Sequence, residues 1–305
     1  MNQIAVLIPC RNEAASIAGV VTDFRRALPS AQIYVYDNNS SDQTAEAART
    51  AGATVRRETL QGKGHVVRRM FADIEAGIYV LVDGDGTYDA AAAPAMIALL
   101  QDEMLDMVTG TRFTQGDQAA YRRFHRSGNR LLTSLVGWVF GNRITDMLSG
   151  YRVFSRRFVK SFPALSAGFE TETEFTVHAL ELDMPLAEMK IPYGTRPEGS
   201  ASKLRTYSDG FRILRSIFLL IKDSRPWAFF STIGLALWLI SLALGLPVVL
   251  NYARTGLVPR LPTAVLSTGL VLIGCLSMVC GLVLDSVARG RKEAKRLAYL
   301  RIPRV

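Results

Sequence analysis

Two long stretches without a charged residue, Pro226–Leu250 and Leu261–Leu284, constrain the fold of this chain more than any other feature. At about 1.5 Å per helical residue, each is long enough to cross a hydrocarbon core of about 30 Å. A buried helix of a water-soluble protein is rarely apolar on every face over such a length. The sequence therefore predicts two transmembrane helices and confines the water-soluble fold to the residues before them.

Basic residues are unevenly distributed around these stretches, within a net charge of +9. The segment Ser286–Val305 has seven basic residues against one acidic residue, whereas the link Asn251–Arg260 has only two basic residues. By the positive-inside rule, the C-terminal tail and the N-terminal domain both face the cytoplasm. A basic tail also suits nucleic acid, but beside a membrane span it favours anionic lipid. Ile4–Ile8 is too short for a signal peptide, and the three cysteines show no metal or disulfide spacing, which fits a reducing compartment.

Ahead of the apolar stretches, short β-branched runs alternate with helical segments. The predicted strands are Ile4–Pro9, Gln32–Tyr36, Thr54–Arg57, Ile78–Val82, Asp106–Thr109 and Leu186–Ile191. The predicted helices run from Asn12 or Ser16 to Leu28 and over Gln43–Ala51, Gly62–Ala76, Ala92–Gln101, Tyr121–Phe140 and Glu170–Leu182. Such alternation indicates an α/β fold with a parallel sheet, whose site lies at the carboxyl ends of the strands. From Leu204 to Phe218, apolar residues at helical spacing with basic residues between them predict an amphipathic helix at the membrane interface, although a helix packed on a soluble core gives the same pattern.

The stretch Tyr79–Asp89, YVLVDGDGTYD, leads from an apolar strand into a glycine-rich turn with two carboxylates. Residues two apart on a strand project to the same side, so Asp83 and Asp85 can face one cation. Gly84 and Gly86 allow phosphate groups to approach the backbone. Hard oxygen ligands suit Mg²⁺ or Mn²⁺. The stretch therefore predicts a metal and diphosphate site, although Asp-Gly clusters also make ordinary turns.

Six short blocks stand in an order that resembles the inverting family 2 glycosyltransferases of GT-A fold: IPCRNE (Ile8–Glu13), DNNSSDQT (Asp37–Thr44), GKG (Gly62–Gly64), DGDGTYD (Asp83–Asp89), GTRF (Gly110–Phe113) and DMLSGYR (Asp146–Arg152). Each block alone is a weak motif, whereas their joint order is specific. Two C-terminal spans and a late basic loop most resemble the polyprenyl-phosphate glycosyltransferases, the dolichol-phosphate mannose synthase and bactoprenol glucosyltransferase group. The resemblance covers about residues 1–284.

The resemblance implies a GT-A (Rossmann-like) nucleotide-sugar domain with Mg²⁺ or Mn²⁺ on Asp83 and Asp85. It places the nucleotide against Pro9, Arg11, Glu13, Asp37 and Asn38. The donor's phosphates are expected to meet Lys63, Gly84, Arg196 and Lys203, although the loop with the last two is one residue longer than expected. Many relatives have a second acid at the position of Asn38; an amide still offers a donor and an acceptor, so uracil remains readable.

By the same resemblance, Asp146 matches the family's proposed catalytic carboxylate, with Arg152 and Asp85 as further catalytic residues. A lipid phosphate acceptor is already ionised at neutral pH, so a strong general base is unnecessary. We therefore expect Asp146 mainly to orient Arg152, the acceptor or the metal shell, with proton removal or a plain loop cap as alternatives. Guanidinium groups bind phosphate bidentately, and the candidates for the acceptor phosphate are Arg122, Arg123, Arg126 and Arg143. One of Glu170, Glu172 and Glu174 is expected to make a structural or sugar contact, and the histidines His65, His125 and His178 to be structural.

These features predict four parts: a cytoplasmic catalytic domain over residues 1–202, an amphipathic juxtamembrane helix over 203–225, two transmembrane helices within 226–288 (about 226–250 and 261–285), and a basic cytoplasmic tail over 289–305. The predicted activity is inverting transfer of one sugar, from UDP-glucose or another UDP-hexose, to polyprenyl (undecaprenyl) phosphate. Alternatives are a GDP-mannose donor, a processive polysaccharide synthase, and a non-enzymatic membrane scaffold or lipid-binding module. Against the synthase, the chain lacks a Q-x-x-R-W motif and has too few spans for a channel. No nucleic acid partner is expected, and a homo-oligomer, a tetramer by resemblance to the bactoprenol enzymes, stays open.

Overall fold

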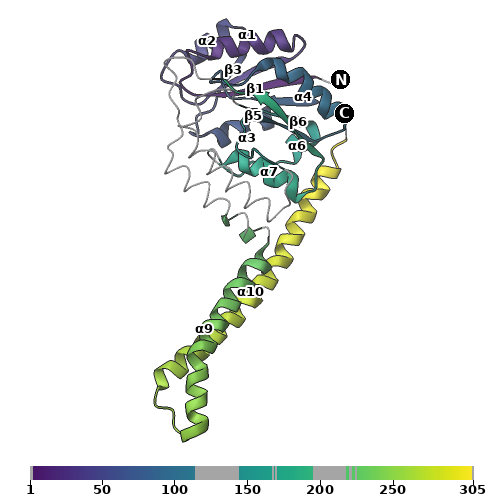
Figure 1. Ribbon diagram of the computed structural model, residues 1–305. Coiled ribbons are helices and arrows are strands. Elements are labelled where there is room, and N and C mark those ends of the chain that lie inside the picture. The colour runs from purple at the N-terminus through teal and green to yellow at the C-terminus, as the bar shows by residue number, and fades with distance from the viewer. Residues whose placement is uncertain are drawn as a thin grey trace. The chain divides into compact units, whose positions relative to one another are not determined.

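The computed structural model describes residues 3–113, 144–166, 168, 170–194, 218–219, 222–223 and 225–303. The chain divides into two compact units. One is formed by residues 1–217 together with 295–305, and the other by residues 218–294. The first unit contains a β-sheet with helices packed on it, and the second contains two long helices (Figure 1).

A single seven-stranded sheet organises the first unit, in the order β3-β2-β1-β4-β6-β5-β7. Its strands are β1 (Ile4–Cys10), β2 (Gln32–Asp37), β3 (Thr54–Arg57), β4 (Ile78–Leu81), β5 (Met107–Phe113), β6 (Arg152–Ser155) and β7 (Leu186–Pro192). The six predicted strands are therefore confirmed, with ends shifted by one or a few residues. Because β1 pairs in parallel with both β2 and β4, the loops after these three strands emerge at the same edge.

One strand and one helix escape the sequence pattern. β6 pairs antiparallel with both β4 and β5, so the sheet is mixed and the expectation of a parallel sheet is wrong at this point. Its four residues include only two apolar side chains, Val153 and Phe154, which are too few for a periodic signal. The short helix α6 (Arg156–Ser161) follows directly. β6 owes its place to pairing with distant strands, and α6 is held by the burial of Phe158 and Val159 in one core cluster.

Helices cover both faces of the sheet (Figure 1). The helices α1 (Ile17–Ala27), α2 (Thr44–Thr50) and α4 (Ala93–Asp102), the last preceded by the short 3₁₀ helix η1 (Ala90–Ala92), contribute to one buried cluster. The other cluster takes in α3 (Lys63–Asp73), α6 and α7 (Thr171–Glu181). Along β1, Val6 and Ile8 belong to the first cluster, whereas Ala5 and Leu7 belong to the second. This alternation follows from the two-residue period of a strand and explains why the sheet is apolar on both faces.

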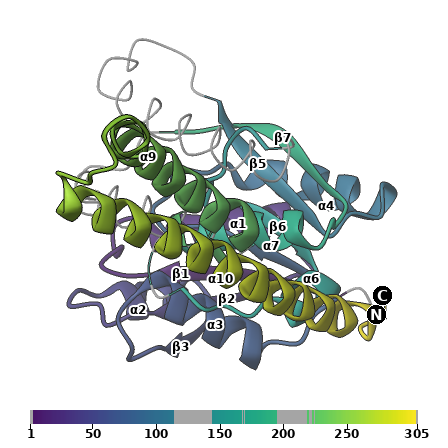
Figure 2. The same cartoon turned by 90° about the horizontal axis from the view of Figure 1, so that it is seen from below.

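The second unit consists mainly of α9 (Pro226–Thr255) and α10 (Leu261–Leu300), which run side by side (Figures 1 and 2). Their most apolar windows have mean hydropathies of 2.4 and 2.3, and only 11% of each window is buried. A core helix of a soluble protein would be mostly buried, so both are candidate membrane spans, as predicted. Small residues bring the helices together: Ser241 and Ser267 join their hydroxyl groups at 2.9 Å, and a Cβ on Gly274 would collide with the Trp238 ring.

The predicted basic tail is helical as far as Leu300, because α10 continues to that residue. From Lys295 onward, these residues belong to the first unit. Tyr299 is 8% exposed, and its hydroxyl donates a hydrogen bond of 2.6 Å to Asp106 Oδ2. The guanidinium of Arg157 lies 4.7 Å from the centre of the Tyr299 ring. Lys295 forms a salt bridge of 2.7 Å with Glu181. Since Asp106 immediately precedes β5, this contact lies at the amino edge of the sheet, opposite the edge where β1, β2 and β4 end.

We predict that Tyr299→Phe destabilises the protein by about 1–3 kcal/mol, because the buried Asp106 carboxylate loses a hydrogen-bond donor. The measurement is urea unfolding of the detergent-solubilised full-length protein. Tyr252→Phe, at a position that is 56% exposed, is the matched control and should leave the unfolding midpoint unchanged. Equal unfolding midpoints for Tyr299→Phe and the wild type would contradict a stabilising contact between Tyr299 and Asp106.

A buried histidine makes the first unit sensitive to acid. Burial, assisted by the charge of Lys295, lowers the pKa of His178 from 6.5 to about 3. Its ring packs edge-on against Phe158 and Phe162, and Nε2 lies 3.3 Å from the Ser161 hydroxyl. Because the folded pKa lies below the unfolded one, the unfolded chain binds more protons between about pH 6.5 and pH 3. Lowering the pH through this window therefore removes stability.

We predict that this group alone costs about 2 kcal/mol of unfolding free energy at pH 5 relative to pH 8. His178→Gln keeps a polar side chain near Ser161 but does not titrate in this range. Urea unfolding of the variant at the two pH values should therefore show a smaller loss than the wild type shows. An identical loss in both proteins would assign the acid sensitivity to other groups.

Candidate active site

The polar loops after β1 and β2 are joined to one another at the carboxyl edge of the sheet. Asn38 N–H donates to the Cys10 carbonyl at 2.8 Å, and Glu13 N–H donates to the Thr44 hydroxyl at 2.8 Å. Asp42 accepts hydrogen bonds from Ala14 N–H and from Thr44 N–H, and the second of these forms a turn at the start of α2. The sequence places two of its six blocks here, and the structure brings them together.

The residues expected to hold the nucleotide differ in exposure. Pro9 is buried within β1, opposite Tyr36 in the pairing with β2, whereas Arg11 is exposed. Asp37 is 7% exposed, and both its carboxylate oxygens lie 3.3 Å from Ser40 N–H. Only Arg11 of these three presents an exposed side chain at the edge.

The whole side-chain amide of Asn38 is engaged in hydrogen bonds within the protein. Its amide donates to the carbonyls of Glu58 and Leu60 at 3.0 and 2.7 Å. Its oxygen accepts from Gln61 Nε2 and from Gly62 N–H at 3.0 and 2.7 Å. All four hydrogen-bonding positions of the amide are thereby used. The expectation that Asn38 reads the base is not supported by this geometry; the residue positions the loop that leads into α3, and a carboxylate could not make the two donations.

Asp83 and Asp85 lie in the turn after β4, which ends at Leu81, so strand periodicity does not place them. Asp85 is 4% exposed and accepts hydrogen bonds from Thr87 N–H and the Thr87 hydroxyl at 3.1 and 2.6 Å. Asp83 is the more accessible of the two, with 30% of its side chain exposed. The two carboxylates therefore have different surroundings despite their equal chemistry.

Glycines allow three loops to meet at this turn. A Cβ on Gly84 would collide with Cys10 Sγ and Glu13 Oε2, and the Gly84 carbonyl accepts a hydrogen bond of 2.7 Å from Ser16 Oγ. Ser16 is the residue before α1, but its hydroxyl makes this bond and caps no helix. A Cβ on Gly150 would collide with the Asp83 carboxylate. Any larger residue at Gly150 would therefore displace the Asp83 carboxylate from its present position.

Lys63, the first residue of α3, connects the turn after β4 to the start of α7. Its ammonium lies 2.5 Å from Asp83 Oδ1 and 2.5 Å from Glu172 Oε1, and only 10% of its side chain is exposed. Burial by itself would lower the pKa of Lys63, but the attraction of the two carboxylates outweighs it and raises the pKa above its ordinary value. Lys63 is therefore charged at neutral pH and neutralises Asp83 in the structure.

The structure distinguishes the three acidic residues at the start of α7, which the sequence could not. Glu174 accepts hydrogen bonds from Leu165 N–H and Ser166 N–H at 2.8 and 2.9 Å and so has a structural role. Glu172 reaches Lys63 and therefore belongs to the site. Burial, reinforced by Asp83 and opposed by Lys63, raises the pKa of Glu172. No sequence signal separates these residues, because their spacing of two does not reveal which one faces α3.

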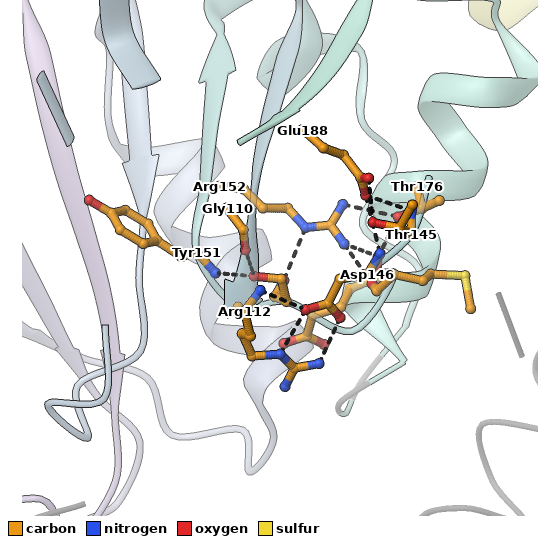
Figure 3. A network of polar contacts seen from close by, with 12 residues as sticks. Gly110, Arg112, Thr145, Asp146, Tyr151, Arg152, Thr176 and Glu188 are labelled. Atoms are coloured by element: carbon orange, nitrogen blue, oxygen red, sulfur yellow. Dashed lines mark hydrogen bonds and ion pairs between the residues drawn. The ribbon is translucent and has the colours of Figure 1, made fainter. Parts of the chain in front are cut away.

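Asp146 pairs with Arg112 of the GTRF block (Figure 3). Arg112 donates from its backbone N–H at 3.2 Å, from Nε at 2.8 Å and from Nη2 at 2.7 Å. Glu188 of β7 supports the same loop by accepting from Thr145 N–H and Asp146 N–H at 2.8 and 3.2 Å. A carboxylate engaged by a guanidinium on both oxygens suits an orienting role better than proton removal. Of the groups that Asp146 is expected to orient, namely Arg152, the acceptor or the metal shell, Arg152 is not its partner here; the Asp146 side chain pairs with Arg112.

Arg152 is fully buried, and each of its five N–H groups has an acceptor within the protein (Figure 3). The acceptors are the carbonyls of Met147, Ser149 and Glu172, the Thr176 hydroxyl and the Met107 sulfur. Burial lowers the pKa of Arg152 to about 10, which leaves the group charged at neutral pH. With every donor engaged, Arg152 does not suit the catalytic role expected from the sequence.

Several predicted site residues lie outside the described part of the chain, and their roles stay predictions. They are the acceptor-phosphate candidates Arg122, Arg123, Arg126 and Arg143, the loop residues Arg196 and Lys203, and His125. The same holds for most of the amphipathic segment over residues 203–225.

The acidic turn offers a partial metal site. Within the described ranges, no group of three or more His, Cys, Asp or Glu side chains gathers closely enough to hold a metal ion by itself. Asp83 and Asp85 supply two carboxylates, the ligand type that Mg²⁺ and Mn²⁺ prefer, and such ions commonly take further ligands from phosphate oxygens and water. These residues therefore fit a divalent ion that binds together with a phosphorylated substrate.

The chain matches the family described as glycosyl transferase family 2 over residues 5–162. It is 32% identical to Glycosyltransferase AglJ of Haloferax volcanii, over 97% of this chain and 98% of that protein. It is 27% identical to Dolichyl-phosphate hexose transferase of the same organism, over 73% of this chain and 96% of that protein. Protein RfbJ of Shigella flexneri is 58% identical over 40% of this chain and 95% of that protein.

Among solved structures, the fold resembles that of glucosyl-3-phosphoglycerate synthase from Mycobacterium tuberculosis. The structure of that protein in complex with Mn²⁺, UDP-glucose and phosphoglyceric acid aligns with a TM-score of 0.58 and 22% identity, over 72% of this chain and 79% of that chain. At this identity, the likeness establishes the GT-A fold of the first unit and nothing about its ligands.

We predict that Arg152→Lys destabilises the protein by about 3 kcal/mol or more, because an ammonium has three donors where the guanidinium uses five, and buried carbonyls lose their partners. Urea unfolding measures the change. Arg156→Lys, whose ion pair with Glu75 is partly exposed, is the control and should stay within about 0.5 kcal/mol of the wild type. Wild-type stability in Arg152→Lys, combined with lost activity, would instead support a catalytic role.

Proposed function

The chain belongs to glycosyltransferase family 2, and we propose that it transfers one hexose, with UDP-glucose as the first candidate donor, to a polyprenyl phosphate at the membrane surface. Sugar transfer follows from the family. The lipid acceptor is supported by the similarity to Dolichyl-phosphate hexose transferase and by the two candidate spans. The donor is supported by the GT-A fold shared with a protein that binds UDP-glucose, and another UDP-hexose or GDP-mannose stays open.

The observation that carries the proposal is the presence, in one chain, of a sugar-transfer domain and two helices long enough to cross a membrane. A soluble acceptor gives no physical reason for such helices. A polyprenyl phosphate does, because its chain is confined to the hydrocarbon core and its phosphate to the headgroup region. From the positive-inside rule we propose that the catalytic domain and the C-terminus face the cytoplasm.

In the proposed reaction, an oxygen of the lipid phosphate attacks the anomeric carbon, and the bond from that carbon to the nucleoside diphosphate breaks. Attack opposite the leaving group inverts the configuration. Arg11, Glu13 and Asp37 bind the nucleotide, and Lys63 meets the departing diphosphate with an ammonium that is already charged. A divalent ion on Asp83 and Asp85 would neutralise the leaving group.

The acceptor needs no strong base, because its phosphate is ionised at neutral pH. The pairing of Asp146 with Arg112 agrees with an orienting role for that carboxylate. Arg122, Arg123, Arg126 and Arg143 are proposed to hold the acceptor phosphate, and Arg196 and Lys203 to close on the diphosphate, since guanidinium and ammonium groups bind phosphate oxygens.

The test is to incubate membranes containing the protein with undecaprenyl phosphate and a panel of nucleotide sugars, and then to determine the mass of the extracted lipid. We predict a single added hexose from UDP-glucose and a β-linkage by NMR from the α-linked donor. Asp83→Asn should lower the rate by about 100-fold or more, because the divalent ion that would neutralise the leaving diphosphate loses a carboxylate ligand. Asp102→Asn, an exposed residue at the end of α4, is the control.

Each alternative has its own result in this assay. Growth of the lipid by many sugars would favour a processive synthase, and addition from GDP-mannose alone would correct the donor. A product of retained configuration would overturn the single displacement. If no nucleotide sugar reacts with lipid or binds to the protein, the chain is a scaffold or lipid-binding module that has kept the fold.

A further inference from the structure

We propose that Glu172 is a positioning residue that holds the Lys63 ammonium when a divalent cation occupies Asp83, and so prevents Lys63 from competing with that cation. The inference rests on the proposed function, because it concerns the same donor site. It assigns a role to a carboxylate that the sequence could not separate from its neighbours Glu170 and Glu174.

Two carboxylates share the ammonium of Lys63. Lys63 Nζ lies 2.5 Å from an oxygen of Asp83 and 2.5 Å from an oxygen of Glu172. These residues come from the start of α3, the turn after β4 and the first turn of α7. Lys63 and Glu172 are the more deeply buried pair, with 10% and 6% of their side chains exposed, whereas 30% of the Asp83 side chain is exposed. Asp83 is therefore the partner that a cation from solution can reach.

A divalent ion at Asp83 would compete with the Lys63 ammonium for the same carboxylate. Lys63 already occupies Asp83 Oδ1, so an ion that binds this carboxylate must displace the ammonium or share the oxygen with it. The two positive charges repel each other strongly in a buried site. The ammonium cannot simply be left without a partner, because an unpaired buried charge is costly. Glu172 is the carboxylate that remains for it.

Glu172 has an oxygen that can accept a further hydrogen bond. Its Oε2 is buried and has no hydrogen-bond partner within the described residues. An unsatisfied buried carboxylate oxygen is unusual and calls for an explanation. Here it can accept the N–H that Lys63 withdraws from Asp83, while another N–H of the ammonium turns to the donor's phosphate. The backbone of Glu172 is fixed in place by a hydrogen bond of 3.1 Å from Arg152 to its carbonyl.

The test is a double-mutant cycle on manganese affinity, which needs no turnover. The full-length protein in a neutral detergent is titrated with Mn²⁺ in the presence of UDP, and free Mn²⁺ is measured by electron paramagnetic resonance. We expect Glu172→Gln to weaken Mn²⁺ binding about tenfold, because Lys63 then pairs with Asp83 alone. Lys63→Met should strengthen Mn²⁺ binding about threefold in the wild type and about thirtyfold in Glu172→Gln. The ratio of these two factors, about tenfold, is the coupling between Lys63 and Glu172, and it lies in the range known for residues of one network.

Two further variants separate contact from charge. Glu172→Asp keeps the charge but draws the carboxylate back by one methylene, so it should weaken Mn²⁺ binding as Glu172→Gln does; wild-type affinity in Glu172→Asp would overturn the proposal. Glu174→Gln lies on the same helix and contacts only backbone N–H groups in the described structure, so its Mn²⁺ affinity should equal that of the wild type. Urea unfolding of each variant identifies any that do not fold, and Lys63→Gln then replaces Lys63→Met in the cycle.

The outcomes also separate this inference from the proposed function. If Lys63→Met strengthens Mn²⁺ binding by the same factor in both backgrounds, the charges act independently and the positioning role of Glu172 is wrong, while the proposed function stands. If the wild type binds no Mn²⁺ with UDP present, or if Asp83→Asn binds it as well as the wild type does, the metal-dependent function fails and the inference fails with it.

Discussion

The buried guanidinium of Arg152 is the interaction on which the site edge of the sheet depends. It stands at the start of β6, between β4 and β5 in the sheet, and donates to the carbonyls of Met147, Ser149 and Glu172. Those carbonyls belong to the loop that brings Gly150 against Asp83 and to the helix that carries Glu172 towards Lys63. A charge buried this deeply persists because every donor is satisfied and because Glu172 and Asp146 lie in its field. Arg152 thereby sets the relative position of several residues of the candidate site.

The candidate site neutralises its own charges before any substrate binds. Lys63 lies between Asp83 and Glu172, and Arg112 is held on Asp146. Transfer of a sugar from a nucleoside diphosphate needs positive groups where negative charge accumulates on the leaving group, and carboxylates where a divalent ion binds. Pairing these groups in advance fixes their geometry at low cost in the free protein. Under the proposed function, these pairs would exchange partners when donor and cation bind.

The two edges of the sheet have different tasks. The carboxyl ends of β1, β2 and β4 carry the polar loops, as expected of an open α/β sheet. The amino edge, next to β5, receives the last turns of α10 through Tyr299 and Asp106. Since α10 is continuous from Leu261 to Leu300, the helix that forms a candidate membrane span is also part of the catalytic unit at its end. The last turns of α10 and the polar loops therefore lie at opposite edges of one sheet.

Local features of the sequence determined the strands and helices, the two apolar spans, the acidic turn and the family, because periodicity, composition and short motifs are all contained in neighbouring residues. Only the tertiary structure placed β6 antiparallel in the sheet, gave Asn38 and Arg152 structural tasks, paired Asp146 with Arg112 and selected Glu172 from three similar residues. The physical reason is the distance along the chain. Arg112 and Asp146 are 34 residues apart, and Lys63 and Glu172 are 109 apart, so their contacts exist only once the sheet has brought its loops to a common edge.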